Sequence, residues 1–108
     1  MHAGGEIVER EKETRGYRRI SELYDGWYAS ENISGYLNRD FVLLDAVKKH
    51  GAFGDYILMT VKDPDTDEVM HLRSGSVVVM DKVMTAVTNG DVPVLVRFVK
   101  KGKYFDVE

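Results

Sequence analysis

Apolar and polar residues alternate in short runs over much of the chain. The runs at 41–49, 56–62 and 68–73 are typical of β-strands, and turn-forming residues separate them. The Asp-Pro-Asp-Thr-Asp segment at 63–67 has the composition of a tight turn, and a wider loop is expected at 50–55. This part of the sequence therefore predicts a three-stranded antiparallel meander.

Residues 74–91 change from a two-residue to a helical period. One helical stripe contains Val77, Val78, Met80, Val83, Met84 and Val87. Ser74 or Ser76 is a suitable N-cap, and Asn89 followed by Gly90 is a typical helix stop. Strand-like runs return at 92–99 and 103–108. The predicted order is three strands, one helix and a final hairpin.

The pattern of the final hairpin predicts its register. If Lys101 and Gly102 form a two-residue turn, Arg97 lies opposite Asp106 and Phe98 lies opposite Phe105. The core face then contains Val96, Phe98, Phe105 and Val107, and the other face contains Arg97, Val99, Tyr104 and Asp106. This register keeps Arg97 away from the apolar set, and its alternative role is a cross-strand pair with Asp106.

The N-terminal part of the chain differs from the rest in its pattern of charged and aromatic residues. Residues 1–16 carry dense mixed charge and predict a flexible tail, with an exposed charged helix as the alternative. Residues 17–40 predict a short helical, aromatic lead-in, in which Tyr24, Trp27 and Tyr28 pack against the domain or a second subunit, with base stacking as the alternative. The predicted organisation is thus a tail, a lead-in and a domain at 41–108.

Composition narrows the class of protein. A chain of 108 residues with 44% hydrophobic and 31% charged residues is expected to form one globular domain. No run approaches the roughly 20 apolar residues of a membrane-spanning helix, and MHAGGEIVEREKE lacks the apolar core of a secretory signal. Cysteine is absent, so neither disulfides nor sulfur-ligated zinc are expected. We expect a cytoplasmic protein with no membrane partner.

The predicted strand order matches the five-stranded OB-type barrel, in which a single helix lies between strands three and four. Three stretches resemble the small OB-fold single-stranded-DNA-binding proteins of phage and related prokaryotic genomes. They are G-x-F-G-D-Y-x-x-x-T-V at 51–61, Ser-Gly-Ser at 74–76 and V-K-K-G-K-Y-F at 99–105. The resemblance leaves out residues 1–40, and it implies that the protein coats or protects single strands in replication, recombination or repair.

OB barrels bind nucleic acid on the face of strands two and three and through the loops between strands one and two and between strands four and five. In this chain those loops carry the basic residues Lys48, Lys49, His50, Lys100, Lys101 and Lys103. Candidate stacking or phosphate-binding side chains on the loops and strands are Phe53, Tyr56, His71, Arg73, Arg97 and Tyr104. These residues also have purely structural interpretations. The lysines can be solvated turn residues, Phe53 can fill the core, and the tyrosines can be half-buried strand residues.

The sequence offers little for catalysis. The three histidines have no metal-ligand spacing, and no phosphate-binding glycine motif or nucleophile signature occurs. The acidic turn lacks the glycine and the terminal glutamate of a calcium loop. We therefore expect no enzyme activity, no cofactor and no metal. Single-stranded DNA is the expected ligand, RNA is an alternative, and a protein-interaction or homo-oligomerisation module built on residues 17–40 is another.

Overall fold

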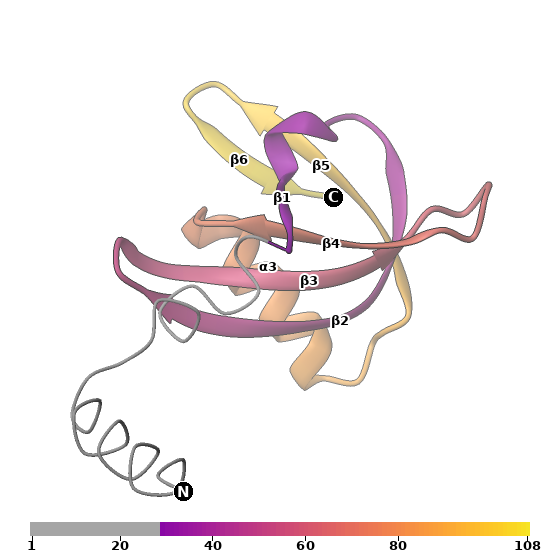
Figure 1. Cartoon of the computed structure of the whole chain (residues 1–108), viewed down its shortest axis with the longest axis horizontal. Coiled ribbons are helices and arrows are strands. Elements are labelled where there is room, and N and C mark those ends of the chain that lie inside the picture. Colours follow the sequence, from indigo (N-terminus) through magenta and orange to yellow (C-terminus); the bar gives the residue numbers. More distant parts are fainter. Residues whose placement is uncertain (1–28) are drawn as a thin grey trace, which may run out of the picture.

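The fold is described for residues 29–108 of a computed structural model. In chain order the elements are β1 (Glu31–Asn32), the 3₁₀ helix η1 (Ile33–Gly35), β2 (Asp40–Gly51), β3 (Gly54–Lys62), β4 (Val69–Ser74), α3 (Val77–Thr88), β5 (Val94–Lys101) and β6 (Tyr104–Val107). The strands form one sheet in the order β1-β4-β3-β2-β5-β6. The sheet curls into a half-barrel with α3 against one side (Figure 1).

Over residues 29–108 this architecture confirms the coarse prediction of a mainly β fold with one α-helix. The prediction of five strands was wrong, because the two-residue strand β1 adds a sixth, parallel to β4. The helix consequently follows the fourth strand in chain order instead of the third. The predicted meander, helix and final hairpin correspond to β2–β4, α3 and β5–β6.

A β-bulge at Leu44 explains how β2 presents its side chains. Leu43 pairs with Val61 and the next paired residue is Asp45, which lies opposite Thr60. Without the extra residue, strict alternation would turn Asp45 toward the same side as Phe41 and Leu43, which are fully buried. The bulge therefore keeps the carboxylate outside and brings Ala46 into the core.

The predicted register of the last hairpin was wrong by two residues. Lys101 pairs with Tyr104, so Gly102 and Lys103 form the turn, and Phe98 lies opposite Val107. Gly102 has φ +64°, and a glycine at the first turn position is the arrangement of type II′ turns. A shift of two residues exchanges every pair but leaves each side chain on its predicted face, because side chains alternate with a period of two.

Helix α3 begins where the serines predicted it. The Ser76 hydroxyl accepts a hydrogen bond from the Val79 N–H and donates one to the Phe105 carbonyl, 2.8 Å away, which fixes the helix start to β6. The buried face contains Val79, Met80 and Val83. Val77 was predicted on the apolar stripe, but it is 75% exposed because Val79 takes the corresponding place in the core.

Residues 29–40 form a strap across the gap between β4 and β5. At one end β1 pairs with Leu72 and Arg73 of β4, and at the other the Asn38 N–H donates to the Phe98 carbonyl at 2.8 Å. Between them Ile33 is fully buried in the core. The predicted helical lead-in is therefore a strand and a 3₁₀ turn over this part, and residues 17–28 lie outside the described range.

Candidate nucleic-acid interface

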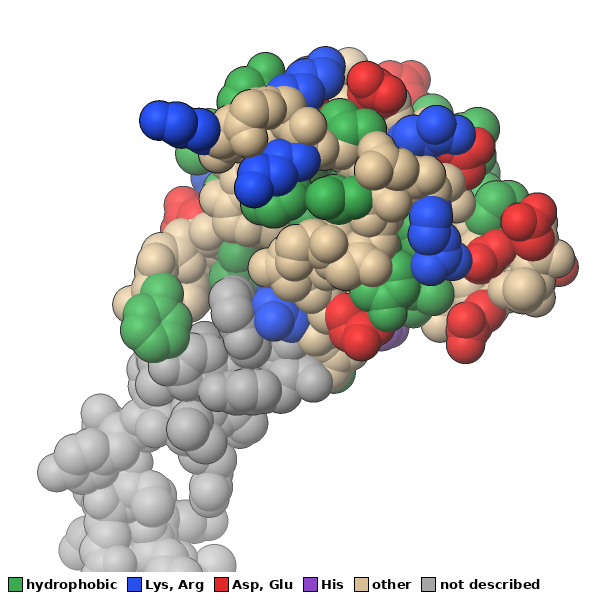
Figure 2. Space-filling model, turned by 90° about the horizontal axis from the view of Figure 1, so that it is seen from above, with side chains coloured by type: hydrophobic (Ala, Val, Ile, Leu, Met, Phe, Trp, Pro, Cys, Tyr) green, Lys and Arg blue, Asp and Glu red, His purple; other side chains and the backbone are tan. Residues whose placement is uncertain are grey.

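Two hairpins project toward the same end of the half-barrel. The β2–β3 turn and the β5–β6 turn both lie at the left in Figure 1, whereas the acidic β3–β4 turn lies at the right. In the view from above a group of acidic side chains lies at that right-hand end, while other acidic side chains and the Lys and Arg side chains are spread over the face (Figure 2). The basic turns and the acidic turn thus occupy opposite ends of the domain.

The β2–β3 hairpin carries an exposed aromatic ring at its tip. Gly51 pairs with Gly54, which leaves Ala52 and Phe53 as the turn, and Phe53 is 87% exposed. Its predicted alternative as a core plug was therefore wrong. The exposure is a property of the turn itself, since both residues that flank it in the ladder are glycines without side chains to cover the ring.

Asp55 ties down the base of this hairpin. Its carboxylate lies 2.5 Å from His50 Nδ1 and 3.6 Å from Lys48 Nζ. The hydrogen bond with His50, followed by the charge interactions with His50 and then with Lys48, lowers the pKa of Asp55. Lys48 is therefore partly neutralised within the chain, a counter-charge that the sequence analysis did not anticipate.

Tyr56 and Lys49 lie opposite each other on β3 and β2. Tyr56 follows the outward face of β3 but is only 3% exposed, so it is neither the half-buried tyrosine nor the open platform that the sequence predicted. A Cβ atom on Gly51 would come within 3.2 Å of the Tyr56 ring. The missing side chain of Gly51 therefore allows the ring to lie close over the hairpin backbone.

The β5–β6 hairpin contributes one ring and three lysines. Tyr104 is 48% exposed, Lys103 occupies the turn, and Lys100 places its ammonium 5.6 Å from the centre of the Phe105 ring. Lys101 instead forms ion pairs with Asp106 at 3.1 Å and Glu108 at 3.8 Å. Its hydrogen bond with Asp106 raises the pKa of Lys101.

Asp106 is a buried carboxylate between two lysines. Lys82 of α3 lies 2.8 Å from Asp106 Oδ1, and the Val107 N–H donates to the same atom at 2.7 Å. These hydrogen bonds, with that of Lys82 the largest cause, lower the pKa of Asp106 to about 2. The carboxylate therefore fastens β6 to the helix and holds Lys101 beside it.

Three adjoining hollows connect the two hairpins. A hollow of about 170 Å³ is bounded by Phe53, Gly54 and Gly75, and one of about 500 Å³ extends from Phe53 and Gly75 to Val77 and the methionines of α3. A third, of about 460 Å³, is lined by Gly75, Val77, Lys103 and Tyr104. Gly75 and Val77 are common to the two larger hollows, so the β4–α3 junction forms the floor between the exposed rings of the two turns.

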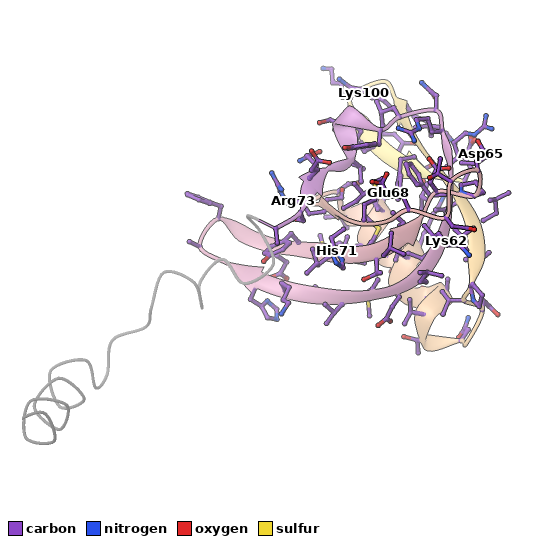
Figure 3. The ribbon with its side chains drawn as sticks, turned by 45° about the vertical axis from the view of Figure 1, so that its right-hand side comes forward. Lys62, Asp65, Glu68, His71, Arg73 and Lys100 are labelled. Atoms are coloured by element: carbon purple, nitrogen blue, oxygen red, sulfur yellow. The ribbon has the colours of Figure 1, made fainter. Side chains whose placement is uncertain are left out.

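His71 and Arg73 lie on the outward face of β4, opposite Leu72 as predicted (Figure 3). His71 is exposed, and its Nδ1 is 3.3 Å from the Thr60 hydroxyl on β3. Arg73 donates to the backbone carbonyl and the hydroxyl of Ser30. The guanidinium therefore holds the beginning of the strap, a structural contact absent from the sequence prediction.

Arg97 has a different partner from the one predicted. The pair with Asp106, which the sequence offered as the alternative role of Arg97, was wrong, since Asp40 lies opposite Arg97 on β2 and accepts from its Nε at 2.8 Å. Glu108 pairs with Arg97 through two backbone hydrogen bonds. The hydrogen bond with Arg97 lowers the pKa of Asp40 and raises that of the guanidinium. Arg97 thus lies on the β2–β5 ladder and lines none of the three hollows.

The sequence analysis missed Gly75 and Val77 as parts of this surface. A signal for Val77 was present, because a stripe built on Val79, Val83 and Val87 leaves Val77 beside the N-cap and outside the buried face. The sequence alone does not separate this stripe from the predicted one that contains Val77, because the choice depends on whether Ser76 or Ser74 caps the helix.

Within residues 29–108 no three histidine or acidic side chains gather in positions suited to a metal ion. No helix in the same range combines the length and apolar character needed to cross a membrane. Comparison with protein-family models, with curated proteins and with solved structures gave no match. The resemblance to OB-fold single-stranded-DNA-binding proteins therefore stays a hypothesis.

Proposed function

We propose that the protein is a non-enzymatic OB-type domain that binds single-stranded nucleic acid, with DNA as the expected ligand. The arrangement of strands supports this: β2 lies between β3 and β5, and β5 continues into β6, as the five principal strands of an open Greek-key barrel require. In this interpretation the strap takes the place beside β4 where the barrel would otherwise remain open.

One observation carries the proposal. The exposed rings of Phe53 and Tyr104 border hollows that share the same floor. Lys48 lines the hollow beside Phe53 together with Asp55 and Asp81, and Lys103 lines the hollow beside Tyr104. Aromatic platforms along a basic path are what sequence-independent binding of a single strand requires, since a stacked base contributes about 1–3 kcal/mol and phosphates attract ammonium groups. Tyr56 is left out of the proposed surface because it is buried.

Fluorescence anisotropy with labelled oligo(dT) tests the proposal. We expect binding that weakens as salt is added, because bound phosphates release counterions. The Lys103→Ala variant should weaken binding and reduce the salt dependence, since Lys103 lies in the turn beside Tyr104. Lys62→Ala is the matched control: it also removes one lysine, but Lys62 is ion-paired with Asp67 near the acidic turn.

Each arm of this experiment has a decisive outcome. Absent or salt-independent binding of oligo(dT) contradicts the proposal. Equal losses in the Lys103→Ala and Lys62→Ala variants would show that the hairpin end is not the binding surface. An oligo(U) competitor of the same length separates DNA from RNA, because stacking and phosphate contacts serve both polymers. Protein interaction through residues 17–40 remains a separate prediction.

A further inference from the structure

The hollow of about 500 Å³ separates one side of α3 from the β2–β3 hairpin. The residues of α3 that line it follow each other at intervals of one to three and share one side of the helix; they are Val77, Met80, Asp81 and Met84. Lys48 and Asp55 belong to the opposite wall. The hollow is thus a groove between a helix and a hairpin, with apolar and charged side chains on its walls.

Strand alternation places this groove on the core side of the sheet. Lys48 lies two residues after Ala46 on β2, and Asp55 lies two residues before Ile57 on β3. Ala46 and Ile57 are both buried in the core. Because side chains alternate with a period of two, Lys48 and Asp55 lie on the same side of the sheet as α3. His71 lies on the opposite, outward face of the sheet (Figure 3).

The helix wall of the groove is apolar and adaptable. Val77 is 75% exposed at its rim, and Met80 and Met84 lie deeper, against the core. Methionine side chains are flexible and adjust to differently shaped apolar groups. A volume of about 500 Å³ is within the range of pockets that enclose ligand groups. This wall therefore suits a large apolar side chain.

The charges of the groove favour a basic ligand. The Asp55 carboxylate is neutralised by Lys48 at 3.6 Å and accompanied by His50 at 2.5 Å. Asp81 is exposed, and within residues 29–108 its carboxylate has no ion-pair partner. One negative charge is thus left uncompensated on the helix wall. It attracts an ammonium or guanidinium group and repels the phosphates of a nucleic acid.

The neighbouring hollow beside Tyr104 has the opposite character. Its described lining contains Lys103 and no acidic side chain. A strand that carries phosphates therefore has a favourable environment beside Tyr104 and an unfavourable one beside Asp81. The two hollows differ in the class of ligand that they suit, although they share Gly75 and Val77.

We infer that the groove between α3 and the β2–β3 hairpin binds a short segment of a partner protein, in which a large apolar residue adjoins a lysine or arginine. The apolar side chain packs between Val77 and the two methionines of α3, and the basic side chain pairs with Asp81. This binding does not require nucleic acid. It gives the domain a second class of ligand, through which a partner protein is recruited.

Selection of peptides from a phage-displayed library of random heptapeptides on the full chain tests this. We expect enriched sequences to combine an apolar residue with an adjoining Lys or Arg. The most enriched peptide is then synthesised with a fluorescein label and titrated by anisotropy. Asp81→Lys should weaken its binding about fivefold or more, since the variant replaces an attraction by a repulsion. Asp91→Lys is the matched control: it makes the same change of charge at an exposed residue beyond the end of α3, and binding should not change.

A second pair of variants tests the apolar contact. Val77→Ser should weaken binding of the same peptide about fivefold, because it removes apolar contact area at the rim of the groove. Leu95→Ser is the matched control, since Leu95 is 59% exposed on β5 and does not line the groove. Circular dichroism should show all four variants folded, because the substituted side chains are exposed.

Each contrary outcome is decisive. A selection that yields no sequences of this chemistry overturns the inference, as do equal losses in Asp81→Lys and Asp91→Lys. Tighter oligo(dT) binding with a steeper salt dependence in Asp81→Lys, but not in Asp91→Lys, would instead assign the groove to the nucleic acid. Asp81-dependent binding of a synthetic peptide of residues 15–22, which carries three arginines with a tyrosine and an isoleucine, would overturn the partner protein in favour of the chain's own N-terminal segment.

Discussion

The strap offers the sharpest test of the fold, through Ile33, its most deeply buried side chain. Ile33 is fully buried although it belongs to a one-turn 3₁₀ helix flanked by exposed residues. Truncating a fully buried isoleucine to alanine costs about 2–5 kcal/mol, from lost burial and the cavity left behind. We therefore expect Ile33→Ala to destabilise the protein by about 3 kcal/mol. For a domain of this size, each kcal/mol lowers Tm by about 4–8 °C.

Thermal and urea unfolding, followed by circular dichroism, measure this loss. Ser34→Ala is the matched control: it lies next in the same turn, its side chain is exposed, and we expect a change within about 0.5 kcal/mol. Hydrogen exchange adds a local readout, because the Asn38 N–H bonded to Phe98 should exchange faster in Ile33→Ala. The reasoning fails if the two variants unfold alike, since the strap would then not belong to the folded core.

Two further substitutions test local features of the fold. Asp106→Asn should lower Tm at neutral pH, because it removes the charge of a carboxylate that stabilises the folded protein. The pKa of Asp106 in the folded protein is about 2, below its ordinary value of 3.8. The stabilisation by the ionised carboxylate is therefore present above pH 3.8 and is lost as the pH falls toward 2. A Tm difference between wild type and variant that persists undiminished at pH 2 would contradict this. Gly54→Ala should lower the free energy of unfolding in urea by about 1–3 kcal/mol, because Gly54 has φ +118°, a conformation that disfavours alanine. Gly35→Ala, at a position with open space around it, should lower it by less. Equal losses in the two variants would contradict the role of the backbone conformation at Gly54.

Periodicity predicted the elements that depend on local pattern. The three meander strands, the helix and the final hairpin each contain a local pattern of apolar residues, bounded by turn or capping residues, that favours the observed secondary structure. Strap and bulge carry no such signal. The strap depends on Ile33 reaching a core built mostly from residues at 41–107, and the bulge depends on excluding Asp45 from that core. Both are tertiary effects that no window of neighbouring residues contains.

The candidate surface shows a similar division. Turn chemistry placed Phe53 and Lys103 in turns, and strand alternation placed Tyr104 and His71 outward. The prediction that the other hairpin lysines lie in loops was wrong, because the ladders extend further: Lys48 and Lys49 belong to β2, and Lys100 and Lys101 belong to β5. Ion-pair partners were not predictable, because Asp40 meets Arg97 and Asp106 meets Lys82 only after elements far apart in the chain come together. Arg97 is an example: the sequence suggested Asp106, which lies in the same hairpin, whereas the observed partner Asp40 lies 57 positions away in the chain.

The charges of the chain limit how many phosphate groups the candidate surface can contact. The chain carries a formal charge of −3, and Lys48 and Lys101, two of the five hairpin lysines, are ion-paired with carboxylates. At most three hairpin lysines then contribute fully to phosphate contacts. Each contact on a single strand adds about 0.7 to the slope of log K against log salt, so the hairpin lysines predict a slope no steeper than about −2.

If the salt dependence of binding is this weak, most of the binding free energy must come from bases stacked on the aromatic rings. We therefore expect Phe53→Ala and Tyr104→Ala to weaken oligo(dT) binding with the salt slope unchanged, whereas Lys103→Ala should make the slope shallower by about 0.7. Anisotropy titrations at four or more salt concentrations measure both quantities. A wild-type slope much steeper than −2 would mean that Asp55 and Asp106 release their lysines on binding, and that the ion pairs in the free protein do not set the number of phosphate contacts.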